Sequence, residues 1–160
     1  MKSVLMSIRA EVCKTIFENW TKRLEYRTRF NKDFKGRIYV YESGKDGTHK
    51  VIGFFDAGHI VRDSADDGIS EEDEKFLDTL DKDTLEFYES IVADKDVLYA
   101  IEIKNPCRYI EPIALRDFAK AKGCSIQCAP QSWQYIETSV DGEGDYETVS
   151  RTKHTKKKKA

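Results

Sequence analysis

Four ionisable side chains fall within six residues of one another near the start of the chain: Lys22, Arg23, Glu25 and Arg27. A lysine beside a carboxylate can act as a base or as an electrostatic stabiliser once both are withdrawn from water. Arginine guanidinium groups suit the oxygens of a phosphate, and a glutamate flanked by arginines keeps its negative charge. This spacing predicts a site for a phosphorylated ligand. If the protein is an enzyme, it predicts Lys22 and Glu25 as the catalytic pair.

The segment that carries these residues has a period of two, which is typical of a β-strand. Leu24, Tyr26 and Thr28 alternate with the ionisable residues Arg23, Glu25, Arg27 and Arg29. One face of the strand is therefore apolar and the other is charged. The alternative to a ligand site is a ladder of solvent-facing ion pairs across neighbouring strands.

Other elements follow from hydrophobic periodicity and from turn residues. Strands are predicted over residues 3–8, 37–41, 49–59, 97–103 and 132–136, and helices over 10–19, 70–80, about 82–92 and 115–121. Ser70 followed by Asp73 resembles a capping box at the start of a helix. The acidic residues 71–74 are interpreted as a solvated first turn that suits the helix dipole. Strands joined by hairpins favour an α+β fold, a mostly antiparallel β-barrel with short helices packed outside it.

Charge is distributed very unevenly along the chain, although the net charge is only −2. Residues 1–50 hold 12 Lys/Arg and 6 Asp/Glu, residues 51–105 hold 5 and 16, and residues 151–160 hold 6 and none. A polyanion is attracted to the first segment and the tail and is repelled by the middle. We therefore expect a small local ligand site rather than a broad polyanion surface, and the acidic residues 63–96 are a possible surface for a basic protein partner.

The length fits one domain, predicted over residues 1–138, followed by a flexible tail over 139–160 with a basic end. No apolar run is long enough for a membrane helix or a signal peptide, so we expect a cytoplasmic protein without a membrane partner. The four cysteines are expected to be free thiols. Cys124 and Cys128 lack a second pair at matching spacing, so no metal and no cofactor are predicted.

Several segments together resemble the ASCH domain family of the PUA-like superfamily, in its bacterial and prophage form. Ser7-Ile8-Arg9, a short helix and then Lys22-x-x-Glu25-x-Arg27 resemble the signature Gly-x-Lys-x-x-Glu-x-Arg. Further along, Lys50-Val-Ile-Gly-Phe, residues 98–106, residues 112–118 and Pro130-Gln-Ser-Trp-Gln-Tyr135 resemble later family segments in the same order. The resemblance implies the PUA-like fold described above. It also implies a cleft for RNA or a nucleotide.

Carried onto this sequence, the resemblance nominates seven ligand-site residues: Ser7, Arg9, Trp20, Lys22, Arg23, Glu25 and Arg27. Trp20 stands where the family motif has glycine, at the turn from helix to strand. Some small family members remove acetyl groups from modified cytidine and carry threonine where this chain has Glu25. A carboxylate cannot replace a hydroxyl nucleophile, which weakens the deacetylase interpretation.

Three functions remain open from the sequence. The first is a binding module that recognises a local single-stranded or modified nucleotide of RNA. The second is a hydrolase that acts on a nucleic acid, either an N4-acetylcytidine amidohydrolase or a ribonuclease. The third is a phage-type protein-interaction factor that uses the acidic residues 63–96.

Overall fold

The structure is a computed structural model, and it describes residues 2–138 and 144–151. Its strands are β1 (Lys2–Arg9), β2 (Leu24–Arg27), β3 (Arg37–Ser43), β4 (Val51–Ser64), β5 (Gly68–Ile69), β6 (Val97–Ile113), β7 (Trp133–Glu137) and β8 (Tyr146–Thr148). Its helices are α1 (Ala10–Phe17), α2 (Glu71–Leu77), α3 (Lys82–Val92) and α4 (Leu115–Lys122). The chain divides into two compact units, one of residues 1–21, 36–56 and 105–160 and one of residues 22–35 and 57–104. Strands β4 and β6 contribute residues to both units.

The first unit is built around β1, whose central residues are fully buried. β1 pairs parallel with β3, placing Leu5 opposite Tyr39, and antiparallel with β7, placing Leu5 opposite Gln134. β3 in turn pairs antiparallel with β4. The buried side chains of these strands form one hydrophobic core with α4, made of Leu5, Tyr39, Val51, Phe54, Cys107, Tyr109, Phe118 and Ile136.

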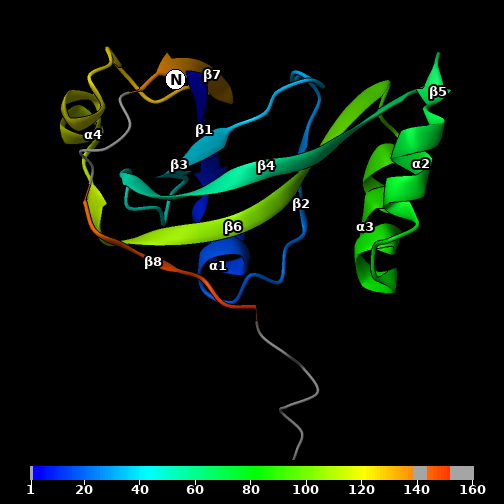
Figure 1. The fold of residues 1–160 in the computed structure, drawn as a ribbon, viewed down its shortest axis with the longest axis horizontal. Helices are drawn as coiled ribbons and strands as arrows, with labels where there is room; N and C mark the ends of the chain where they lie inside the picture. The colour runs from blue at the N-terminus through cyan, green and yellow to red at the C-terminus, as the bar shows by residue number, and fades with distance from the viewer. Residues whose placement is uncertain (1, 139–143, 152–160) are drawn as a thin grey trace, which may run out of the picture. The chain divides into compact units, whose positions relative to one another are not determined.

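Helix α1 follows β1 directly (Figure 1). One face of the helix is buried. Cys13, Ile16 and Phe17 lie on that face, as the sequence periodicity predicts. Gly53 of β4 allows the helix to approach, because a Cβ atom there would lie 2.9 Å from Phe17 Cε1 and 2.3 Å from the carbonyl oxygen of Cys107. A larger residue at position 53 would displace backbone and not only a flexible side chain.

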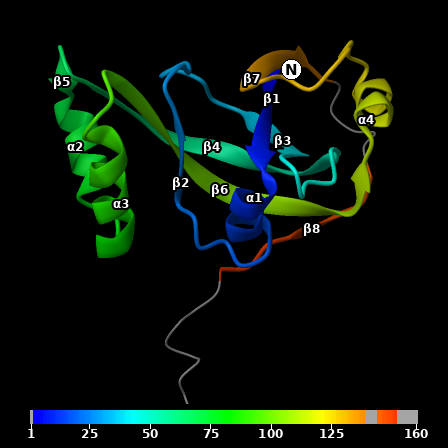
Figure 2. The ribbon, with the colours of Figure 1, turned by 180° about the vertical axis from the view of Figure 1, so that it is seen from behind.

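The second unit pairs β2 antiparallel with β6 and β4 with β5. Helices α2 and α3 lie side by side in both views of the fold (Figures 1 and 2). Their apolar faces join the strands in a second core, made of Leu24, Val61, Leu77, Tyr88, Leu98 and Ala100. Ser70 Oγ accepts a hydrogen bond from Asp73 N, and Asp81 Oδ2 accepts one from Thr84 N, so both helices begin with a side-chain cap.

Three predictions about elements need correction. β4 and β6 are longer than the strands predicted over residues 49–59 and 97–103. β6 continues through Asn105 and Pro106, and Asn105 adopts a positive φ of 50°. Little regular structure was predicted after residue 140, yet Tyr146–Thr148 forms β8 and pairs with Cys107, Arg108 and Tyr109. The lysine-rich end of the predicted tail lies outside the described residues. Helix α4 matches its prediction and ends at Gly123, which adopts the left-handed conformation.

Candidate functional site

The charged face of β2 forms a compact cluster in the second unit. Glu25 lies between two cations: Arg27 donates a hydrogen bond to Glu25 Oε2 at 2.7 Å, and Lys22 Nζ lies 3.7 Å from Glu25 Oε1. The three side chains are only 8–17% exposed. Pairing of β2 with β6, which places Glu25 opposite Ile101 and Arg27 opposite Tyr99, fixes the backbone beneath them. Lys22, Glu25 and Arg27 therefore form a largely desolvated group with a net charge of +1.

Lys22 sits against aromatic rings as well as against the carboxylate. Its Nζ is 5.0 Å from the centroid of the Tyr26 ring, a cation–π distance. Burial lowers the pKa of Lys22, although the negative charge of Glu25 opposes that shift. Burial and the charge of Glu25 together raise the pKa of Tyr26. Lys22 is thus a cation whose charge is poorly hydrated, which strengthens its interaction with an incoming anion.

An exposed aromatic ring adjoins the cluster. Phe87 of α3 is 52% exposed, and its ring lies 5.7 Å from that of Tyr26, tilted by 60°. The neighbouring Tyr88 anchors the helix, because its hydroxyl donates a 2.6 Å hydrogen bond to Asp63 Oδ2. Phe87 is therefore held on a fixed element while about half of the residue stays exposed.

Arg23 is the fourth charged residue of the predicted site. Its carbonyl accepts a hydrogen bond from Ile103 N at 2.9 Å, which extends the pairing of β2 with β6 by one residue. Its Nε is buried and meets no hydrogen-bond acceptor among the described residues.

The other three predicted site residues belong to the first unit. Ser7 Oγ donates a hydrogen bond to the carbonyl of Pro130 at 2.7 Å, and Arg9 pairs with Glu11 at 2.9 Å on the surface. Trp20 adopts a positive φ of 49°, a conformation that glycine tolerates without strain, and glycine is the residue at this place in the motif that the sequence resembles. The guanidinium of Arg151 lies 4.5 Å from the centroid of the Trp20 ring. The ligand-site assignment of these three residues stays a prediction.

A second group of charged residues in the same unit was not predicted from the sequence. The side chain of Asp73 is 1% exposed, so it is not part of a solvated first turn as the sequence suggested. Its Oδ1 lies 2.8 Å from Lys32 Nζ and 2.7 Å from His59 Nε2, and its Oδ2 accepts a hydrogen bond from Arg62 N at 3.0 Å. The His59 ring stacks on Phe76. Asp73 thereby ties α2 to β4 and to the loop after β2.

The ligand atoms of His59, Glu72 and Asp73 lie within 4.8 Å of one another, a spacing that a metal ion could use. The charges do not favour such an ion, because Lys32 already neutralises Asp73 at hydrogen-bond distance. A divalent cation placed there would meet an ammonium group within about the same distance and be repelled. We interpret the group as a buried ion-pair network that holds the unit together.

Comparisons with known proteins define the fold. No protein-family model matches the chain, and no curated protein matches it in sequence. Among solved structures, ASCH from Zymomonas mobilis matches with a TM-score of 0.53 and 20% identity, covering 83% of this chain and 86% of that one. A tyrosine-to-phenylalanine mutant of ZmASCH gives a TM-score of 0.53 and 20% identity, with 84% and 90% of the two chains covered. A serine-to-alanine mutant gives 0.52 and 19%, with 83% and 87% covered.

These matches show that the protein has an α+β fold similar to that of the solved ASCH structures. Its fold is thus that of an ASCH domain, as the motif resemblance implied. Among the described residues, no helix combines the length and the apolar character needed to cross a membrane.

Proposed function

We propose that the protein binds RNA or a single nucleotide locally, through Lys22, Arg23, Arg27 and Phe87 of the second unit. The observation that carries this proposal is the exposed ring of Phe87 beside the desolvated cation cluster. A base stacks on an aromatic ring whatever its sequence, while guanidinium and ammonium groups hold the adjoining phosphate. In this proposal the base of a nucleotide lies on Phe87, and its phosphate lies against the adjoining cationic side chains.

The charge distribution supports a short ligand over a long one. Helices α2 and α3 belong to the same unit as the cluster, and their first turns are acidic. Segment 51–105 carries 16 acidic and 5 basic residues, so an extended nucleic acid that left the cluster along this unit would be repelled. A mononucleotide, a strand end or an unpaired base in a loop avoids that repulsion.

The proposal predicts that RNA affinity depends only weakly on salt concentration and that Arg27→Gln lowers this affinity. In fluorescence anisotropy with labelled RNA pentamers, contact with one or two phosphates gives a slope of log K against log salt of roughly −1. Arg27→Gln should weaken binding several-fold. Arg116→Gln, which removes an exposed arginine of α4, is the matched control and should leave binding unchanged. Absence of saturable binding at low salt, or equal affinities for the two variants, would sink the proposal.

A second candidate function is hydrolysis of a nucleic-acid base or backbone by Lys22 and Glu25. The lowered pKa of Lys22, 3.7 Å from a carboxylate oxygen, favours this candidate because such a lysine serves as a proton acceptor more readily. Wild-type protein and Lys22→Ala would be incubated with N4-acetylcytidine and with labelled RNA. Turnover by the wild type and its loss in Lys22→Ala would support an enzyme. Equal turnover by both would exclude the role assigned to Lys22.

A further inference from the structure

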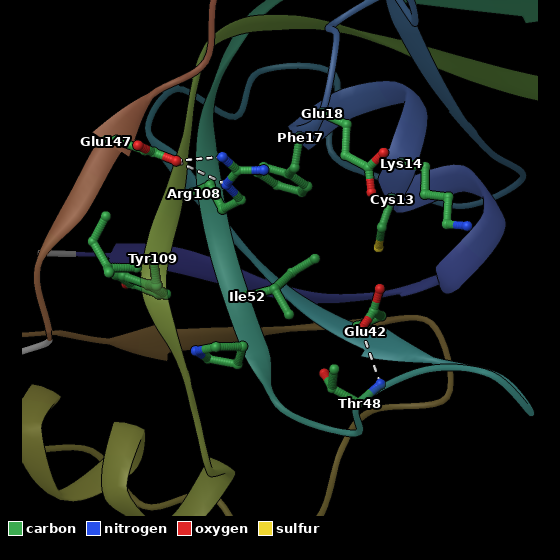
Figure 3. A pocket seen from close by; sticks show the side chains of 12 residues that line it. Cys13, Lys14, Phe17, Glu18, Glu42, Thr48, Ile52, Arg108, Tyr109 and Glu147 are labelled. Carbon is green, nitrogen blue, oxygen red and sulfur yellow. Dashed lines mark hydrogen bonds and ion pairs between the residues drawn. The ribbon is translucent and has the colours of Figure 1, made fainter.

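A cavity of about 520 Å³ lies in the first unit, bordered by α1, β3, β4, β6 and β8 (Figure 3). None of the seven predicted ligand-site residues lines it. Its size lies within the range of sites for small organic molecules. We call it the α1 pocket, defined by Cys13, Phe17, Glu18, Glu42, Ile52 and Arg108 among its lining residues.

The floor of the α1 pocket is apolar and is fixed by packing. The register between β3 and β4 shifts at this point, since Val40 lies opposite Gly53 and Tyr41 opposite Val51. Ile52 is consequently the extra residue of a β-bulge, a feature that re-aims a side chain, and Figure 3 shows its side chain directed into the hollow. Phe17 is 2% exposed and packs against Gly53. The floor is therefore rigid, and Ile52, at 8% exposed, offers more accessible apolar surface than Phe17.

The rim of the α1 pocket has an excess of negative charge. The guanidinium of Arg108 is paired with Glu147. The Glu147 carboxylate accepts hydrogen bonds from Arg108 Nε at 3.1 Å and from a terminal nitrogen of Arg108. The carboxylate of Glu42 accepts a hydrogen bond from Thr48 N at 2.9 Å. Within residues 2–138 and 144–151, the Glu18 side chain makes no hydrogen bond and no ion pair. With Arg108 and Glu147 paired, Lys14 is the remaining cation among the lining residues and Glu18 and Glu42 are the remaining anions, so the lining has a net charge of −1.

We propose that the α1 pocket binds a small, flat organic cation such as an aryl amidinium or aryl ammonium compound. The ring lies on Ile52, which is held in a rigid floor with Phe17, and the charged nitrogen meets Glu18 and Glu42. Figure 3 shows these two carboxylates on one side of the pocket and the Arg108–Glu147 pair on the other. An anion of the same shape would meet the same carboxylates and be rejected, so charge selects the ligand. No residue that lines this pocket belongs to the proposed nucleotide site.

Three probes of equal shape and different charge test the proposal on the full chain: benzamidinium, benzamide and benzoate. In ¹H–¹⁵N NMR titrations, benzamidinium should give saturable shifts at the amides of Cys13, Glu42 and Ile52. Benzamide should bind several-fold more weakly, and benzoate should not bind there. All three affinities are measured on the wild-type protein, so the comparison does not depend on whether a variant folds. Equal affinity for benzoate and benzamidinium, or shifts elsewhere or nowhere, would overturn the proposal.

Two variants then test whether Glu42 is responsible for the preference for a cation. Glu42→Gln should weaken benzamidinium by about threefold, the effect of one partly exposed charge pair, and should leave benzamide unchanged. Glu111→Gln removes an exposed carboxylate that does not line the pocket and serves as the control. Equal affinities of the two variants for benzamidinium would contradict the role given to Glu42.

Discussion

Asp73→Ala is expected to lower the free energy of unfolding by roughly 3 kcal/mol, towards the lower end of the cost of breaking a buried ion pair. The substitution removes the acceptor for Lys32, for His59 and for the amide of Arg62 at once. Lys32 is 34% exposed and can turn towards water, which keeps the loss from being larger. Urea unfolding measures the difference. Glu72→Gln, an exposed change on the same helical turn, should stay within about 0.5 kcal/mol of the wild type.

The same carboxylate makes stability depend on pH in a defined direction. Burial acts to raise the pKa of Asp73, but the hydrogen bonds from Lys32, the Arg62 amide and His59 prevail and hold that pKa below its ordinary value. A group whose pKa is depressed by folding contributes stability above its unfolded pKa, and this contribution is lost as pH falls towards the folded value. Asp73→Asn should therefore show a smaller loss of stability on acidification than the wild type. An unchanged acid dependence would show that Asp73 is not a charged anchor.

Phe87→Ala is expected to weaken binding of a single-stranded RNA pentamer by roughly 5- to 150-fold, the cost of losing one base–aromatic stack. The ring is 52% exposed and supplies no hydrogen bond, so little stability should be lost with it. Fluorescence anisotropy gives the affinity, and thermal unfolding checks the fold.

Tyr146→Ala is the matched control for this loss. Tyr146 is 51% exposed, as Phe87 is, but it lies on β8 in the first unit. Its removal should leave RNA affinity unchanged. If both variants bind equally well, or if Phe87→Ala binds as tightly as the wild type, stacking on Phe87 is not part of recognition.

The charged face of β2 could be predicted because strand geometry is local. Alternation with a period of two places Glu25 and Arg27 on the same face whatever the rest of the fold does. The structure adds what alternation cannot reveal, namely that this face is largely desolvated and that Glu25 contacts both cations. The desolvation depends on β6 and α3, which lie at least 50 residues away in sequence, whereas both cations that contact Glu25 come from the same short segment.

The exposure of Phe87 could have been predicted from the sequence. The apolar stripe of α3 runs through Leu85, Tyr88, Ile91 and Val92, and Phe87 falls outside it. A large aromatic residue off the buried stripe of an amphipathic helix is expected to be exposed. Asp73 carried no such signal, because its burial depends on Lys32 and His59, which reach it from other segments of the chain.

The α1 pocket could not be predicted from the sequence either. Its floor depends on a register shift of one residue between β3 and β4, and its walls come from five segments of the chain. Hydrophobic periodicity predicts that Ile52 is apolar and in a strand. It does not predict that a bulge directs the side chain into a cavity.

The most direct test of the proposed function is to map where RNA binds. ¹⁵N-labelled protein would be titrated with an unlabelled RNA pentamer while the backbone amides are followed by NMR. The account predicts saturable shifts centred on residues 22–27 and on Phe87, with the amides that line the α1 pocket unmoved. Shifts centred on the α1 pocket, or spread evenly over the protein with no centre at β2, would contradict it.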